Sequence, residues 1–241
     1  MTYQFNWNVL WNGQSGSWLL QGVVTTLELS LLGWLLAVFL GVISGALRTS
    51  LLVPLRWLAA AYVEFFRNVP LLVWMFLCYF GVPPLLPQAL QEWLFEHHAE
   101  FIAGVLALGV YHGARFSEVI RSGIQSIPKT QYEAAVSTGL TVAQSFRLII
   151  LPIALRLIVP PATNETLNLL KNSSVALTIG VAELTFQTRQ IETYTARAFE
   201  ALMAGTLIYL ALCLTISLIM ARIERRIAIP GLIVRGHIGE S

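Results

Sequence analysis

The stretch from Tyr132 to Pro152 reads YEAAVSTGLTVAQSFRLIILP and lies between two long apolar segments. Its first part, from Gln131 to Gly139, is rich in alanine and glutamate, residues that favour helix. Gly139 can close that helix, and Thr141 can cap a second one that runs to Ile150. We therefore expect a hairpin of two short helices, small enough to enter a groove on another protein. An ordinary amphipathic loop fits the same pattern.

The composition indicates a membrane protein. Of the 241 residues, 56% are hydrophobic and only 12% are charged, which is about half the charged fraction of soluble domains. Five apolar segments are each long enough to cross about 30 Å of hydrocarbon as a helix. They are residues 22–47, 57–80, 101–124, 155–181 and 198–221. We predict an all-α integral membrane protein whose single membrane domain, 22–226, follows an N-terminal segment, 1–21, and precedes a tail, 227–241.

Lysines and arginines predict how the chain is oriented. The N-terminal segment and the loop at 81–100 contain neither residue. The loop at 125–154, the other links on its side and the tail are basic. Their cations are Arg48, Arg56, Arg121, Lys129, Arg147, Arg156, Arg222, Arg225, Arg226 and Arg235. Because positive residues collect on the cytoplasmic side, we place the N-terminus outside, and the C-terminus and the 125–154 loop inside.

Pro70 interrupts the second apolar segment, shortly after Glu64, Arg67 and Asn68. Proline cannot donate a backbone hydrogen bond, so we expect a kink or break there. A break at membrane depth is tolerated only where the freed backbone faces protein or a water-filled cavity.

A polar stripe marks the fourth segment. At about 100° per residue, its members fall within a sector of roughly 120°. They are Asn164, Glu165, Asn168, Lys171 and Asn172. Charged groups within a span usually face the bundle interior and mark a pathway, although a structural network that holds helices together has the same appearance.

The sequence contains no glycine-rich phosphate loop of the GxxxxGK[ST] kind. If ATP drives this protein, a partner must therefore bind it. We expect no metal site: His97 and His98 lie in an outer loop that we interpret as solvated. The stripe alone would also permit a transporter driven by Na⁺ or H⁺. A membrane enzyme is a further alternative, but no nucleophile–base pair can be identified from the spacing.

The stretch at 132–152 carries a longer signature. Glu133-Ala134-Ala135, three residues, Gly139, nine residues, Ile149, one residue and Leu151-Pro152 resemble the signature of the permease subunits of bacterial ABC importers. Three further stretches resemble the polar amino-acid branch of that family. They are Phe65–Val73, Arg121–Lys129 and Lys171–Ser174.

This resemblance implies a MetI-like type I importer domain in the bacterial inner membrane. Its coupling helix, which would contain Glu133, Ala134, Ala135 and Gly139, docks into the ATP-binding subunit. The implied partners are two ATP-binding subunits, a second permease that is identical or similar, a periplasmic amino-acid-binding protein and the lipid bilayer, but no nucleic acid. The chain itself would have no cofactor and no enzymatic activity, since ATP and Mg²⁺ belong to the partner ATPase.

The same stretches look most like those of glutamate/aspartate permeases, although permeases for glutamine, basic amino acids or cystine share much of the pattern. An acidic amino acid needs cations for its carboxylates and an acceptor for its ammonium group. We hypothesise a pathway lined by Lys171 and Arg67, with Glu165 as the acceptor. Its amides are Asn68, Asn164, Asn168 and Asn172. Arg67 could instead pair with Glu64. Arg115 is a further cation that could contact the substrate, but we expect it to pair with Glu118, three residues away.

Overall fold

The computed structural model describes residues 3–11, 13–50 and 52–227, and every element in these ranges is a helix. The predicted all-α class is therefore confirmed. The predicted tail beyond Ile227, with Arg235, lies outside the described residues. The ten α-helices are α1 (Ser15–Arg48), α2 (Val53–Asn68), α3 (Leu71–Phe76), α4 (Gln88–Glu96), α5 (Ala99–Gln125), α6 (Lys129–Ser137), α7 (Val142–Ser145), α8 (Leu151–Asn172), α9 (Leu184–Thr195) and α10 (Ala198–Ile227). Shorter turns are the 3₁₀ segments η1 (Trp7–Leu10), η3 (Pro83–Leu85) and η5 (Ser173–Ile179) and the π-helical segments η2 (Leu77–Gly81) and η4 (Phe146–Ile150).

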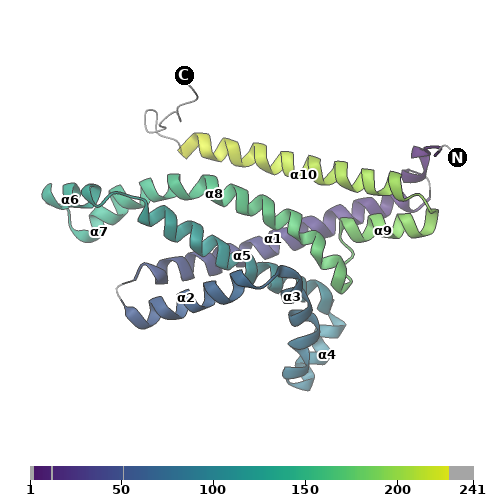
Figure 1. Ribbon diagram of the computed structural model, residues 1–241, viewed down its shortest axis with the longest axis horizontal. Coiled ribbons are helices and arrows are strands. Elements are labelled where there is room, and N and C mark those ends of the chain that lie inside the picture. The colour runs from purple at the N-terminus through teal and green to yellow at the C-terminus, as the bar shows by residue number, and fades with distance from the viewer. Residues whose placement is uncertain (1–2, 12, 51, 228–241) are drawn as a thin grey trace.

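The centre of the bundle is the seam between α1 and α5, which lie side by side (Figure 1). Glycines allow the two backbones to approach closely. A Cβ atom added to Gly41 would lie only 2.5 Å from Cβ of Phe116, and one added to Gly45 would lie 3.0 Å from Cβ of Ile120. Helices α2 and α8 also pack on α5, and α10 packs on α8 and α9.

Not all of the five expected spans are apolar along their whole length. Within the described residues, three helical segments are long and apolar enough to cross a membrane: α1, the run Val142–Ile179 and α10. A fourth is present if α2 and the segment Leu71–Gly81 form one bent span. Helix α5 has 27 residues, so its length suffices. Its second half is more polar than the other spans, since it contains Arg115, Glu118 and Arg121.

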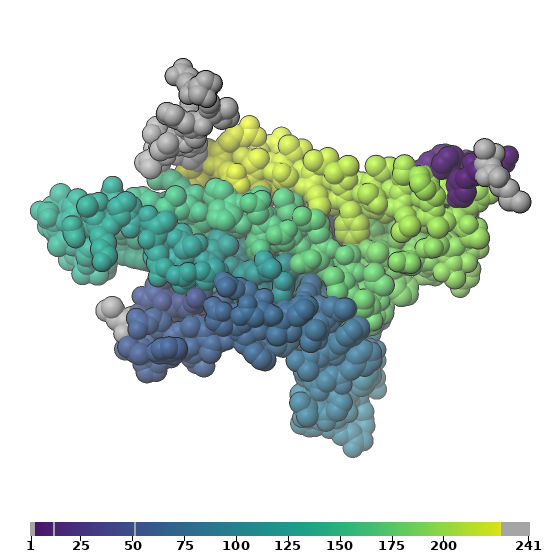
Figure 2. Space-filling model, viewed as in Figure 1, coloured from purple at the N-terminus to yellow at the C-terminus, as the bar shows by residue number. Residues whose placement is uncertain are grey.

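The expected second span, 57–80, is broken where Pro70 predicted a break. Helix α2 ends at Asn68, and the segment Leu71–Gly81 leaves it at an angle of 102°. Val69 has φ −102° and ψ 135°, the extended backbone that a following proline favours. Helix α3 packs in the core, and α4 stands out from the bundle as an arm (Figures 1 and 2).

A side chain compensates for the missing donor of Pro70. In an unbroken helix, the carbonyl of Phe66 would accept from the backbone N–H of residue 70. Proline has no such N–H. Instead, Nε1 of Trp74 donates to the Phe66 carbonyl over 3.2 Å. The carbonyl that the break leaves without a backbone donor is thus hydrogen-bonded. Trp74 itself belongs to the core cluster that contains Leu108 and Ala176.

The fourth apolar segment begins earlier than residue 155, because α7, η4 and α8 form one continuous run. Pro160 and Pro161 therefore lie inside α8 and not in its first turns. The run ends at Gly180, whose φ of +90° is the left-handed conformation that favours glycine. Helix α10 then returns to the end of the bundle opposite η1 (Figure 1).

Candidate functional site

The hairpin of α6 and α7 has the conformation that the sequence predicts. Helix α6 stops at Gly139, which has φ +86° and donates its N–H to the carbonyl of Val136 over 2.9 Å. The next residue, Leu140, donates to the carbonyl of Ala135 over 3.3 Å. These bonds satisfy carbonyls that the helix end would otherwise leave unpaired.

Thr141 then starts α7 with a capping box. Its Oγ1 accepts from the backbone N–H of Gln144 over 3.3 Å, while Oε1 of Gln144 accepts from the backbone N–H of Thr141 over 2.9 Å. The predicted second helix is confirmed, but it does not stop at Ile150. It continues through η4 into α8, so the hairpin is joined to a membrane helix without a flexible link.

The hairpin projects beyond the bundle at the end where α10 finishes (Figure 1). Of the four proposed coupling residues, Glu133, Ala134 and Gly139 are exposed, whereas Ala135 is buried. Three large apolar side chains are also exposed on the hairpin. They are Tyr132, Val136 and Val142. An exposed apolar surface on a small, capped projection is suited to a protein partner.

The polar centre of the bundle is a network between α5 and α8. The fully buried His112 lies with Nδ1 2.6 Å from Oε1 of Glu165, which is 6% exposed. The other ring nitrogen, Nε2, lies 3.2 Å from Nδ2 of Asn172. If Nδ1 carries the proton, His112 donates to the carboxylate and accepts from the amide. Both polar atoms of the ring are thus satisfied.

The sequence analysis did not identify His112. The available signal was an ionisable side chain in the apolar third segment, one helical turn before Arg115. Its partners on α8 lie 53 and 60 residues further along the chain. Sequence spacing within one helix could not indicate that contact.

The expected pair between Arg115 and Glu118 is wrong. Glu118 instead pairs with Arg48, whose Nη1 lies 2.5 Å from Oε2 of Glu118, and with Arg121. Arg115 turns toward the network, with Nε 3.9 Å from Oε1 of Glu165, and its Nη2 donates to the hydroxyl of Tyr111 over 3.1 Å. The i, i+3 spacing allowed the pair, but cross-helix partners occupy the carboxylate.

The structure divides the polar stripe of α8. Asn164 and Lys171 are exposed, and Asn168 is half-buried. Glu165 and Asn172 are held by His112. One edge of the stripe therefore belongs to the internal network, and the other edge faces outward from this single chain.

Arg67 and Asn68 lie at the end of α2 and are both exposed. Nδ2 of Asn68 donates to Glu64 over 3.1 Å. The alternative pair of Arg67 with Glu64 is not formed in the described structure. Val69, in the break, packs on the cluster that contains Ala176 of η5. The break thus lies against the segment that follows the stripe.

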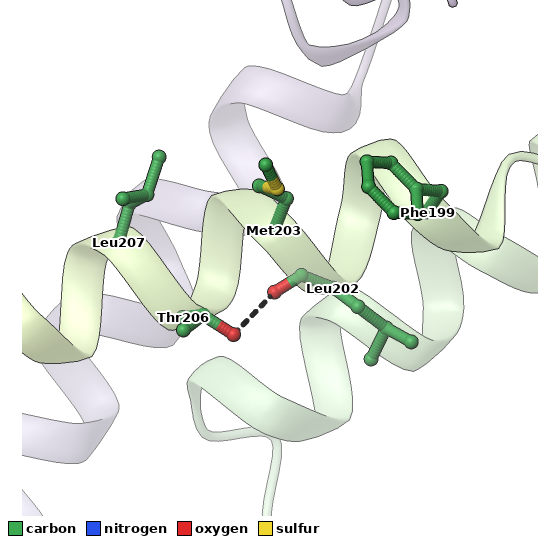
Figure 3. Close-up of a pocket in the computed structure, with 5 residues that line it drawn as sticks. All are labelled: Phe199, Leu202, Met203, Thr206 and Leu207. Carbon is green, nitrogen blue, oxygen red and sulfur yellow. Dashed lines mark hydrogen bonds between the residues drawn. The ribbon is translucent and has the colours of Figure 1, made fainter.

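An apolar hollow lies on the surface of α10 (Figure 3). Its lining residues are Phe199, Leu202, Met203, Thr206 and Leu207. The hydroxyl of Thr206 donates to the carbonyl of Leu202 over 2.8 Å, so it offers no free donor. An apolar lining without charge is typical of a surface covered by lipid.

Comparison with known proteins identifies this arrangement. Residues 37–229 match the family described as the inner membrane component of binding-protein-dependent transport systems. The chain belongs to this family. It is 38% identical to the glutamate/aspartate import permease GltJ of Escherichia coli K12, over 96% of this chain and 98% of that protein. It is 33% identical to the glutamine transport permease GlnP of the same organism, over 94% of this chain and 99% of that one.

Solved structures agree with this family and its fold. A crystal structure of an amino acid ABC transporter superposes with a TM-score of 0.80 at 33% identity, over 94% of this chain and all of that chain. The methionine transporter MetNI gives a TM-score of 0.66 at 19% identity, which shows the same fold. The chain is a permease subunit of an amino-acid ABC importer. In this family, ATP hydrolysis takes place on a separate subunit.

Proposed function

We propose that this permease imports glutamate and aspartate from a periplasmic binding protein into the cytoplasm. The observation that carries the proposal is the 38% identity to a glutamate/aspartate permease over 96% of the chain. The 33% identity to a glutamine permease makes glutamine the second candidate. A cationic side chain on the exposed edge of the α8 stripe, Lys171, favours an acidic substrate.

The proposed topology has five crossings of the bacterial inner membrane, with the N-terminus in the periplasm and the C-terminus in the cytoplasm. Helix α5 would be the additional crossing. Its polar groups support this assignment, because His112 and Ser117 are buried in the bundle and do not face lipid. The positions of η1 and of the end of α10 at opposite ends of the bundle (Figure 1) also suit an odd number of crossings.

In the proposed assembly, this chain works with a second permease, identical or similar, and two ATP-binding subunits that carry ATP and Mg²⁺. The α6–α7 hairpin would dock on one of these subunits and transmit its movement. Glu133, Ala134 and Gly139 are exposed for direct contact, and Ala135 would instead shape the hairpin from inside. The periplasmic loops, including α4 and α9, would receive the binding protein.

The proposed substrate pathway runs along the exposed edge of the α8 stripe, toward the second permease. Lys171 and Arg67 would supply positive charge. The amides would be Asn68, Asn164 and Asn168, and Asn172 would border the pathway from the internal edge, where it contacts His112. Glu165 would act beside the pathway, since its carboxylate is already close to His112. The packing of the α2–α3 break against η5 supports the inclusion of Arg67 and Asn68.

Uptake by proteoliposomes that contain the complete complex tests this proposal. ATP and the loaded binding protein should drive uptake of glutamate and aspartate, and Lys171→Ala should reduce the turnover at least about tenfold, the loss of one charge-assisted contact. Lys171→Arg is the matched control and should retain uptake. Unchanged uptake by Lys171→Ala at normal membrane expression would remove Lys171 from the pathway. Uptake of glutamine alone would replace the substrate, and uptake driven by an ion gradient without ATPase would replace the transporter class.

A further inference from the structure

Arg115 commits few of its hydrogen-bond donors to the protein. An arginine side chain has five N–H donors. Only Nη2 makes a hydrogen bond to another side chain in the described structure, to Tyr111. Nε is buried without a hydrogen-bond partner among the described residues. The nearest carboxylate oxygen, Oε1 of Glu165, lies 3.9 Å from Nε, which is too far for a hydrogen bond.

Glu165 is also shared. The same oxygen, Oε1, lies 2.6 Å from Nδ1 of His112. The carboxylate therefore balances the charge of Arg115 without a hydrogen bond to Nε. Glu118 is not a second charge partner, because it pairs with Arg48 and Arg121.

The orientation of Arg115 is nevertheless fixed. Its guanidinium lies over the ring of Tyr111, 5.1 Å from the ring centroid, while its side chain remains 41% exposed. Behind it are the buried His112 and Glu165. A guanidinium whose orientation is fixed by its neighbours, and whose side chain is partly exposed, can bind a carboxylate through two parallel N–H groups.

The network also places Arg115 beside the polar stripe. Glu165 and Asn172 are members of the stripe, and both contact His112 on α5. Arg115 is one helical turn from His112 on the same helix. It therefore lies at the edge of the stripe that contains Glu165.

We propose that Arg115 is a carboxylate-binding residue of the translocation pathway. The inference rests on the proposed amino-acid import by this chain, and it assigns to the pathway a cation that the sequence analysis expected to pair with Glu118. The ligand is a carboxylate of the amino-acid substrate, which binds to the outward N–H groups of Arg115. Tyr111 and Glu165 position the guanidinium.

Direct binding of radiolabelled glutamate to the purified complex, without the binding protein, tests the proposal. Omitting the binding protein is necessary because its own affinity would otherwise dominate uptake at low substrate concentration. Arg115→Gln should weaken glutamate binding at least about tenfold, the loss of a charge-assisted pair. Arg115→Lys should give an intermediate value, because it keeps the charge but not the fork of donors. Glutamine, measured in parallel, shows which carboxylate is bound: an equal loss indicates the α-carboxylate, and a loss for glutamate alone indicates the side chain.

Arg121→Gln is the matched control, since Arg121 lies on the same helix and has its own carboxylate partner, Glu118. It should bind glutamate within about twofold of the wild type, and a loss as large as that of Arg115→Gln would overturn the proposal by showing a general effect of charge. Co-elution with the ATP-binding subunits confirms that each variant is folded. A folded Arg115→Gln complex with wild-type affinity overturns the role of Arg115 and leaves the proposed import intact. If the wild type binds glutamine but not glutamate, the proposed acidic substrate is wrong. In that case, unchanged glutamine binding by Arg115→Gln would also overturn the proposed role of Arg115.

Discussion

The α6–α7 hairpin and the His112 network are built from opposite kinds of contact. In the hairpin, the bonds that stop α6 at Gly139 and start α7 at Thr141 join residues no more than five positions apart. In the network, His112 meets Glu165 and Asn172 across 53 and 60 residues. The hairpin is therefore specified locally, whereas the network exists only when α5 and α8 are packed together.

The two regions are nevertheless connected through the same helices. Helix α5 leads into the hairpin, and α8 continues from it through η4. The network joins α5 to α8 further along their lengths. The hairpin is thus attached at both ends to a pair of helices that the network holds together. Because the hairpin bonds are local and the network bonds are not, we expect changes in the hairpin to affect coupling and changes in the network to affect stability.

The largest effect is expected from Gly139→Pro. Proline fixes φ near −65° and has no N–H, whereas Gly139 has φ +86° and donates to Val136. The end of α6 should be displaced, and ATP hydrolysis stimulated by the loaded binding protein should fall to the unstimulated level. The measurement is ATPase activity of the reconstituted complex.

Gly139→Asn is the control for this change. Asparagine tolerates the left-handed conformation better than other residues, and an added Cβ meets no atom within 4 Å. Its stimulated ATPase should remain close to that of the wild type. If Gly139→Pro instead prevents membrane insertion of the whole complex, the hairpin is mainly structural and the comparison between the two regions fails.

The next largest effect is expected from His112→Leu. The substitution leaves the buried carboxylate of Glu165 without its 2.6 Å partner. Removing the hydrogen-bond partner of a buried polar group costs about 1–3 kcal/mol, and more when that group is charged. The double variant with Glu165→Leu should lose less stability than the sum of the single changes. Denaturant unfolding of the purified permease measures each free energy.

Ser117→Ala serves as the matched control on α5. Ser117 is also fully buried, but its hydroxyl has no hydrogen-bond partner among the described residues. Its loss should leave the free energy of unfolding nearly unchanged. Additive effects of His112→Leu and Glu165→Leu would show that the two side chains do not stabilise each other.

The contrast also explains what the sequence could predict. Gly139 and Thr141 are local signals, and they correctly predicted the end of α6 and the start of α7. Helical periodicity correctly placed Glu165 and Asn172 on one face of α8, but it could not show that His112 would meet them. The pairing of Arg115 failed for the same reason, since the competing partners of Glu118 come partly from α1.

The smallest effect, and the sharpest test of local specification, is expected from Thr141→Ala. The substitution removes the Oγ1 acceptor for the N–H of Gln144. Loss of such a cap costs about 1 kcal/mol, so amide exchange at residues 142–144 should accelerate about fivefold. Thr141→Ser keeps the acceptor and should exchange as the wild type does. Because the lost bond lies within the hairpin, exchange around His112 and Glu165 should not change; acceleration there would mean that the hairpin and the network form one cooperative unit.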